Sequence, residues 1–270
     1  MTRFLHLTDI HLTAPEAEDP HQYADTVTVL ARMVEIANGI TPRPDFIVAS
    51  GDLTNVGDAA SYRLLRQMMA PLDMPVLFAL GNHDKREGFF AVFPDHAAGP
   101  EGTVDHDAVI AGVHVVVLDS LQPGQVSGGL SPAQLAHAEE MLARHPDLPK
   151  LVAIHHPPRL DPASPYAWET LNDETTARLG DLLAGRNVLA VLSGHIHTNR
   201  VTLWRGIPVV TNIGQQSGVD ETLETGMTIL EDGGFAICDL LPGGLQVTFS
   251  SLAERGVIKA LPDSLLRGFS

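Results

Sequence analysis

Six short apolar runs recur along the chain and predict buried β-strands. They are rich in Val, Ile, Leu and Phe, and they span residues 3–7, 45–50, 75–80, 113–119, 150–156 and 187–194. Apolar residues fill these runs almost continuously, which is typical of strands that are buried on both faces.

Four longer segments between the runs have the pattern of helices. They span residues 23–38, 59–70, 131–145 and 173–184. Ser131 followed by Pro132 is a favourable helix start, and Asn172 before Asp173 and Glu174 is another, because a small polar cap and early acidic residues stabilise a helix N-terminus. The alternation of strands and helices, which continues to about residue 192, predicts βαβ units.

Beyond that point the pattern changes to short strands without helices between them. These strands span residues 201–205, 207–212, 226–232, 234–240 and 245–251. We expect them to form a second, more antiparallel sheet that packs on the first. The sequence therefore predicts a single α/β domain over residues 1–270, with two packed mixed sheets flanked by helices and with residues 251–270 as a C-terminal tail.

Charge and cysteine content narrow the classes of function. The chain has 17 Lys and Arg against 33 Asp and Glu, a net charge of −16, which disfavours nucleic-acid polymers and anionic membranes as partners. The single cysteine, Cys238, excludes an intrachain disulfide framework and favours a reducing compartment such as the cytoplasm. We expect no signal peptide, because few apolar residues precede Asp9, and we expect no membrane span, because no apolar run is long enough to cross a bilayer.

Polar clusters follow five of the predicted strands, each at the carboxyl end of its strand. They are Asp9 with His11, Asp52, Asn82 with His83 and Asp84, His155 with His156, and His195 with His197. Ligand sites form at this edge of α/β sheets, so we expect the five clusters to converge.

The residue types favour a site for divalent transition metals. Carboxylates, imidazoles and one amide, without a thiolate, suit Mn, Fe, Co or Zn. The candidate ligands are more than one tetrahedral ion would take, so two ions that share a bridging ligand are the economical arrangement. They are Asp9, His11, Asp52, Asn82, His155, His195 and His197. Taken one at a time, the clusters have an ordinary alternative as turns or exposed strand ends, and only their joint occurrence favours the metal site.

Five short blocks, "DIH", "GDLTNVG", "GNHD", "HHPP" and "GHIH", occur in this order between residues 9 and 197. Together they resemble the signature of the calcineurin-like metallophosphoesterases. The stretches "GDLTNVGDAASY", "LDSLQPGQVSGGLSPAQL" and "HHPP" are similar in particular to class III cyclic nucleotide phosphodiesterases and related glycerophosphodiesterases. This resemblance covers roughly the first three-quarters of the chain and implies a four-layer αββα sandwich.

The resemblance also implies how the ligands are divided between the ions. One ion would be held by Asp9, His11, Asp52 and His197, and the other by Asp52, Asn82, His155 and His195. Asp52 would then bridge the two ions.

Further residues are candidates for contact with the substrate. His83 follows Asn82 and is the candidate to contact the phosphoryl oxygen or to protonate the leaving alkoxide, with Asp84 orienting it. Asn82 and His156 are further candidate substrate contacts. For His156 two alternatives stay open, a supporting hydrogen bond to a metal ligand and a place in the turn before Pro157. Tyr166 and Trp168 in loop 157–172 could stack on a base, but the favoured interpretation is that they anchor the loop. Gln215 and Gln216 are weaker candidates for substrate contact.

These features predict a dinuclear, metal-dependent phosphodiesterase in which hydroxide held by the ions attacks phosphorus in line with the leaving oxygen. Two divalent ions, two carboxylates and one hydroxide leave about one positive charge, which suits a singly charged diester. From the resemblance alone, the expected substrate is a cyclic nucleotide of the 3',5'-cAMP type, with glycerophosphodiesters next. The alternatives are a phosphomonoesterase of the same fold and a non-catalytic protein-binding scaffold. The sequence leaves the oligomeric state open; the resemblance suggests a homo-oligomer, with residues 252–270 as the candidate contact.

Overall fold

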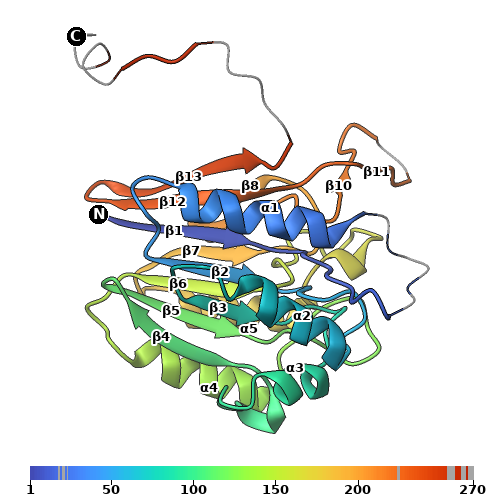
Figure 1. Ribbon diagram of the computed structural model, residues 1–270. Coiled ribbons are helices and arrows are strands. Elements are labelled where there is room, and N and C mark those ends of the chain that lie inside the picture. The colour runs from blue at the N-terminus through green and yellow to red at the C-terminus, as the bar shows by residue number, and fades with distance from the viewer. Residues whose placement is uncertain are drawn as a thin grey trace.

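Two β-sheets form the centre of the computed structural model (Figure 1), which describes residues 1–17, 19, 22, 24–223, 226–253, 259–262 and 266. The five-stranded sheet has the order β13-β12-β1-β2-β3. Its strands are β1 (Thr2–Leu7), β2 (Phe46–Ser50), β3 (Val76–Ala79), β12 (Gly234–Leu241) and β13 (Gly244–Ser251). Strands β1, β2 and β3 are parallel, and β12 pairs antiparallel with β1 and with β13.

The six-stranded sheet has the order β4-β5-β6-β7-β9-β8. Its strands are β4 (His106–Ile110), β5 (Val113–Leu118), β6 (Lys150–Ile154), β7 (Val188–Ser193), β8 (Arg200–Trp204) and β9 (Ile207–Thr211). Strands β5, β6, β7 and β9 are parallel, whereas the edge strands β4 and β8 are antiparallel to their neighbours. A small hairpin of β10 (Gly218–Val219) and β11 (Ile229–Leu230) stands apart from both large sheets.

This topology confirms two packed mixed sheets but corrects the expected assignment of strands. The strands after residue 192 do not form the second sheet by themselves. Instead, β8 and β9 extend the six-stranded sheet, whereas β12 and β13 extend the five-stranded one. The six parallel strands predicted first are accordingly divided between the two sheets, with β1 to β3 in one and β5 to β7 in the other.

The helices cover the outer faces of the two sheets. They are α1 (Thr26–Gly39), α2 (Ala59–Met69), α3 (Arg86–Val92), α4 (Pro132–Ala143) and α5 (Asp173–Leu183). Both predicted caps are present, since Ser131 forms a reciprocal capping box with Gln134 and Asn172 accepts a hydrogen bond from the backbone N–H of Thr175. The predicted helix start at residue 23 lies outside the described residues, and α1 is capped by Asp25. Helix α3 and strand β4 were not predicted.

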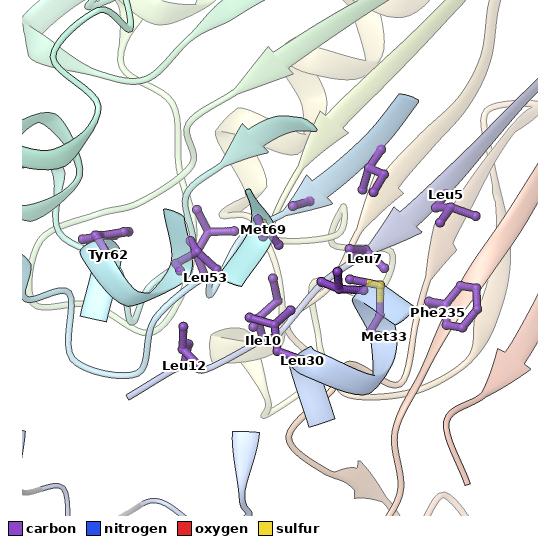
Figure 2. Packing of buried hydrophobic residues seen from close by; sticks show 14 of the residues in the cluster. Leu5, Leu7, Ile10, Leu12, Leu30, Met33, Leu53, Tyr62, Met69 and Phe235 are labelled. Carbon is purple, nitrogen blue, oxygen red and sulfur yellow. The ribbon is translucent and has the colours of Figure 1, made fainter. Parts of the chain in front are cut away.

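Three apolar clusters hold the layers together. The first joins α1 and α2 to the five-stranded sheet, and Figure 2 shows Leu30 and Met33 of α1 near Leu7 of β1. The second lies between the sheets, and the third joins α4 and α5 to the six-stranded sheet. Along β2, Ile47 packs in the first cluster and Val48 in the second, because side chains alternate between the two faces of a strand. The result is a four-layer αββα arrangement.

The C-terminal residues and the lengths of the helices are the two remaining features of the fold. Strand β13 includes Ser251, and residues 254–258, 263–265 and 267–270 of the expected tail lie outside the described residues. Among the residues that are described, no helix is long and apolar enough to cross a bilayer. The division into one domain and a tail stays a prediction.

Candidate metal centre

The loops that follow β1, β2, β3, β6 and β7 meet where the carboxyl ends of the two sheets approach each other. The backbone N–H of Asp9 donates to the carbonyl of Gly51 at 3.0 Å, which joins the first loop to the second. Across the gap between the sheets, His155 Nδ1 lies 2.9 Å from the carbonyl of Ser50, and the backbone N–H of His195 lies 3.0 Å from Asp9 Oδ2. The expected convergence therefore occurs, but it draws on the edges of two sheets.

The backbone is strained at five of the seven candidate ligands. Asp9, His11, Asp52, His195 and His197 have φ angles of 49°, 48°, 47°, 74° and 46°. Such left-handed conformations are uncommon for residues other than glycine, and they persist only where the surrounding structure enforces them. Strained residues of this kind cluster at functional sites, so their concentration in these loops favours a functional role over a stabilising one.

Two glycines allow the loops to come this close. A Cβ atom on Gly81 would lie 2.2 Å from Asp52 Oδ1, and one on Gly194 would lie 1.8 Å from Thr8 Oγ1 and 2.5 Å from Asp9 Oδ2. Any larger residue at either position would displace a carboxylate of the site.

Asp9, His11 and His197 form the first group of potential ligands. His197 Nε2 lies 3.4 Å from Asp9 Oδ1, and His11 Nε2 lies 3.9 Å from the same oxygen. The two Nε2 atoms are 3.3 Å apart. Such spacing of three donor atoms around one point would let the buried Asp9 and His11 and the partly buried His197 hold one cation.

Asp52 lies between this group and the next. Its Oδ2 atom is 3.6 Å from His11 Nε2 and 3.2 Å from His155 Nε2, while Oδ1 accepts a hydrogen bond from the backbone N–H of His83 at 2.9 Å. One carboxylate oxygen is therefore flanked by an imidazole from each side of the site. This position is suited to a bridging ligand.

Asn82 and His195 complete the second side. Asn82 Oδ1 is buried without a hydrogen-bond partner, and the rings of His155 and His195 lie 5.1 Å apart. An unpaired buried carbonyl oxygen is unfavourable unless something binds it, and a divalent cation would do so. The donor set thus fits the metals that the sequence predicts.

Hydrogen bonds orient all four histidines. Three of them use Nδ1: His11 pairs with Asn55 Oδ1 at 2.6 Å, His155 with the Ser50 carbonyl at 2.9 Å, and His197 with the Ser217 carbonyl at 2.9 Å. His195 is reversed, because its Nε2 pairs with the Trp168 carbonyl at 2.8 Å. Since an oxygen acceptor fixes a proton on one ring nitrogen, the other nitrogen is the one that faces the site and can offer its lone pair to a metal.

Burial and charge separate these histidines into two classes. Burial lowers the pKa of His11 and of His195 to about 4, so both rings are neutral near pH 7. Burial also acts to lower the pKa of His155, but the neighbouring Asp52 carboxylate outweighs it and raises the pKa to about 9. The pKa of His197 is raised in the same way by Asp9. The neighbouring carboxylates thus favour a proton on each of these two rings, and a bound cation would take the place of such a proton.

The expected role of Asp84 is corrected by its contacts. Its carboxylate accepts hydrogen bonds from the backbone N–H groups of Gly81, Leu53 and Thr54, at 2.9 to 3.1 Å, and from the Tyr62 hydroxyl at 2.7 Å. Asp84 therefore fastens two of the loops instead of orienting His83.

His83 is oriented by a different residue. Its Nδ1 lies 3.0 Å from the backbone carbonyl of Asn55, and its side chain is exposed. This bond leaves Nε2 available for proton exchange.

His156 has a structural set of contacts. Its ring is fully buried, Nε2 lies 2.9 Å from the Val126 carbonyl, and Nδ1 lies 2.7 Å from Ser120 Oγ. Both nitrogens are engaged, so the geometry gives no support for direct contact with a substrate. These bonds hold loop 122–129 beside the site.

A cavity of about 790 Å³ opens onto the metal centre, and we call it the site cavity. Its lining includes His11, His83, His195 and His197, together with Tyr166 and Trp168 from loop 157–172 and residues of the β10–β11 hairpin. Gln216 also lines it, whereas Gln215 is buried outside it. Asn55 and Ser217 are the supporting residues that sequence reasoning missed. Asn55 stands in the block "GDLTNVG", which was a usable signal. Ser217 faces His197 Nδ1 with its backbone carbonyl at 2.9 Å and its Oγ at 3.2 Å, and no residue type reveals the carbonyl.

Comparison with known proteins assigns a class to this combination of fold and site. The family model of the calcineurin-like phosphoesterases matches residues 2–199, and the chain belongs to this family. The chain is 32% identical over 234 residues to a cAMP/cGMP dual specificity phosphodiesterase of Mycobacterium tuberculosis, covering 85% of this chain and 72% of that protein. It is 33% identical over 178 residues to a probable glycerophosphodiester phosphodiesterase of Arcobacter nitrofigilis, covering 64% of each.

A solved structure shows the same fold. A dimetal phosphatase from Danio rerio superposes with a TM-score of 0.66 at 16% sequence identity, covering 94% of this chain and 97% of that one. At this level of identity the match concerns the fold alone.

Proposed function

We propose that this protein is a dinuclear metal-dependent phosphodiesterase whose substrate is a small, singly charged phosphodiester of the cyclic nucleotide type. The observation that carries the proposal is the convergence of five loops on two buried carboxylates, with Asp52 Oδ2 between His11 Nε2 at 3.6 Å and His155 Nε2 at 3.2 Å. A shared carboxylate can hold two ions close enough together to act on one phosphoryl group.

The residues divide between the two ions as the family pattern implies. Asp9, His11, Asp52 and His197 would hold one ion, and Asp52, Asn82, His155 and His195 the other. Two divalent ions, of Mn, Fe, Co or Zn, would polarise the phosphoryl oxygens and lower the pKa of a water molecule. The oxygen acceptors behind each histidine hold a proton on the ring nitrogen that faces away from the centre and aim the other nitrogen at it.

His83 is the residue that we assign to proton transfer. It lines the site cavity, and its Nδ1 is tied to the Asn55 carbonyl at 3.0 Å. Its Nε2 would hold a proton close to the leaving oxygen and give it up as the P–O bond breaks, which for a cyclic nucleotide frees a ribose hydroxyl. Asn82, one residue earlier, would position the phosphoryl group.

The charges around the site cavity support a diester over a monoester. Besides the histidines, the described lining carries one cation, Arg200, and three carboxylates, those of Glu169, Asp220 and Glu221. A dianionic substrate would meet more repulsion from these carboxylates than a singly charged diester would. Glycerophosphodiesters are the second candidate, favoured by the glycerophosphodiesterase relative.

The surroundings of the enzyme complete the proposal. The buried, unpaired Cys238 agrees with a reducing compartment, so we place the protein in the cytoplasm. The net charge of −16 favours a small-molecule substrate over a nucleic-acid polymer. Assembly into a homo-oligomer stays a prediction.

Substitution of the shared ligand tests the proposal. We expect Asp52→Ala and Asn82→Ala to abolish hydrolysis of bis(p-nitrophenyl) phosphate and to lower the bound metal from two ions per chain, while circular dichroism stays unchanged. Asp181→Asn, which alters a surface ion pair with Arg205, is the control and keeps full activity. Near-normal turnover in either ligand variant would refute the two-ion site.

Full activity of the metal-free protein would also refute the two-ion site. A protein that takes up metal but hydrolyses neither diesters nor monoesters would instead support the scaffold alternative.

A further inference from the structure

Loop 157–172 places an indole ring beside the proposed metal ligands. The ring of Trp168 lies 6.0 Å from the ring of His195, at an interplanar angle of 75°. The backbone carbonyl of Trp168 pairs with His195 Nε2 at 2.8 Å. The backbone of this residue therefore supports the metal site, while its side chain lines the site cavity and is not needed for that bond.

Exposed apolar side chains complete the walls of the site cavity. Leu223, Met227 and Ile229, from the hairpin region, are 44%, 51% and 46% exposed, and Tyr166 is 45% exposed. Apolar side chains that remain exposed around a concave site are typical of ligand pockets, and a volume of about 790 Å³ is ample for a group larger than glycerol.

Two of the three carboxylates that line the site cavity interact with neighbouring groups. Burial raises the pKa of Glu169 and Arg200 opposes this, so the two side chains interact. Asp220 accepts hydrogen bonds from the backbone N–H and the hydroxyl of Thr222. Arg200 would repel a quaternary ammonium group, and two aromatic rings are few for a cage around one.

We propose that Trp168 is the stacking surface for the nucleobase of the substrate and the residue that determines specificity for nucleotide diesters. The proposal rests on the phosphodiesterase function and names the part of the substrate that lies away from the metals. A phosphoryl group held at the metal centre brings the attached nucleoside next to the indole ring, and aromatic rings stack on bases of any sequence.

A comparison of two substrates tests this role. We expect Trp168→Ala to raise KM for 3',5'-cAMP about tenfold, the size of a lost stacking contact. KM for a ribose 3',5'-cyclic phosphate that carries a methyl group in place of the base should not change, and Trp168→Phe should restore most of the affinity for cAMP. Tyr166→Ala serves as the comparison and should have the smaller effect on cAMP.

An equal change in KM for both cyclic phosphates would overturn the stacking role and leave the phosphodiesterase function intact. Equal KM values of the wild-type enzyme for cAMP and for the methyl-bearing cyclic phosphate would also overturn the stacking role.

Fluorescence provides a readout that does not depend on turnover. The chain has two tryptophans, and Trp204 is buried in the cluster beneath α4 and α5, so Trp204→Phe leaves Trp168 as the sole tryptophan, whose emission is excited selectively over that of the tyrosines. Adenosine 5'-monophosphate should quench this emission in the metal-loaded protein, whereas ribose 5-phosphate should not. Quenching by AMP without any diester hydrolysis would refute the proposed function and support the stacking surface. Quenching by choline instead of AMP, or equal quenching by AMP and ribose 5-phosphate, would overturn the stacking role of Trp168.

Discussion

Asn55 offers the sharpest test of how the metal centre is supported, because its side chain contacts a proposed ligand without being one. Asn55 Oδ1 accepts the Nδ1–H of His11 at 2.6 Å, and the Asn55 amide in turn contacts the carboxylate of Asp19. His11 is only 2% exposed, so no water can replace the acceptor freely. The substitution Asn55→Ala removes this bond and leaves the backbone carbonyl that holds His83 in place.

The magnitude follows from the lost contact. A buried N–H without an acceptor costs about 1 to 3 kcal/mol. Because about 1.4 kcal/mol corresponds to a tenfold change in a binding constant, the affinity for the ion on His11 should fall about tenfold to a hundredfold. Turnover at saturating metal should stay close to that of the wild type, since the ligands, Asp52 and His83 are all retained.

Metal titration of the activity measures both quantities in one series. Apoprotein is titrated with Mn²⁺, and the half-saturating concentration and the limiting kcat are read from the same curve. Asn38→Ala is the matched control, because this exposed asparagine bonds the Pro71 carbonyl and the Asp73 N–H far from the site. An unchanged half-saturating concentration would refute the supporting role, and a loss confined to limiting kcat would place Asn55 in contact with the substrate instead.

Three further outcomes follow from the same geometry. Asp84→Ala leaves several buried donors without an acceptor, so the free energy of unfolding should fall by at least about 3 kcal/mol, measured by urea denaturation of the metal-free protein; a loss below 1 kcal/mol would contradict this role. Gly194→Ala should abolish metal binding because its Cβ would lie 1.8 Å from Thr8 Oγ1, whereas Gly39→Ala, with nothing within 4 Å, should bind metal normally; equal metal content in both would show that the loops can yield. Chelation should lower the melting temperature, since an ion at a hundred times its Kd stabilises the fold by about 2.7 kcal/mol per site; an unchanged melting curve would count against metal binding to the folded state.

Strong local patterns explain which elements could be predicted. The buried strands and the capped helices carry signals within their own residues, such as Ser131 with Gln134 at the start of α4. Helix α3 is only seven residues long, and its cap, Lys85, makes no side-chain capping bond. Strand β4 is an edge strand whose sequence "HDAVI" has no continuous apolar run, and none of its side chains is fully buried. Short elements of this kind are defined by their neighbours and not by their own pattern.

The division of strands between the sheets could not be predicted for a related reason. Strands β9 and β12 have similar apolar content, yet β9 pairs with β7 in one sheet and β12 pairs with β1 in the other. Register between distant strands depends on complementary faces across the core, which periodicity along the chain does not encode. The ligand positions were easier to predict because each is a polar residue at the end of an apolar strand. Their supports were not, since three of the four histidine acceptors are backbone carbonyls.

The shape of the blocks "DIH" and "GHIH" has a physical cause in the backbone. Each block ends in two proposed ligands with positive φ on either side of an isoleucine: Asp9 and His11 in the first block, His195 and His197 in the second. The isoleucine of the first block, Ile10, is fully buried. The conformation is fixed by bonds between loops: the His11 N–H donates to the Asp52 carbonyl at 2.9 Å, and the His195 N–H lies 3.0 Å from Asp9 Oδ2. Each such residue stores about 1 to 3 kcal/mol of strain, which the surrounding bonds and the buried isoleucine must offset. The ligands are thus set in place by the protein itself, so metal binding is expected to replace the proton at His155 instead of reorganising the loops.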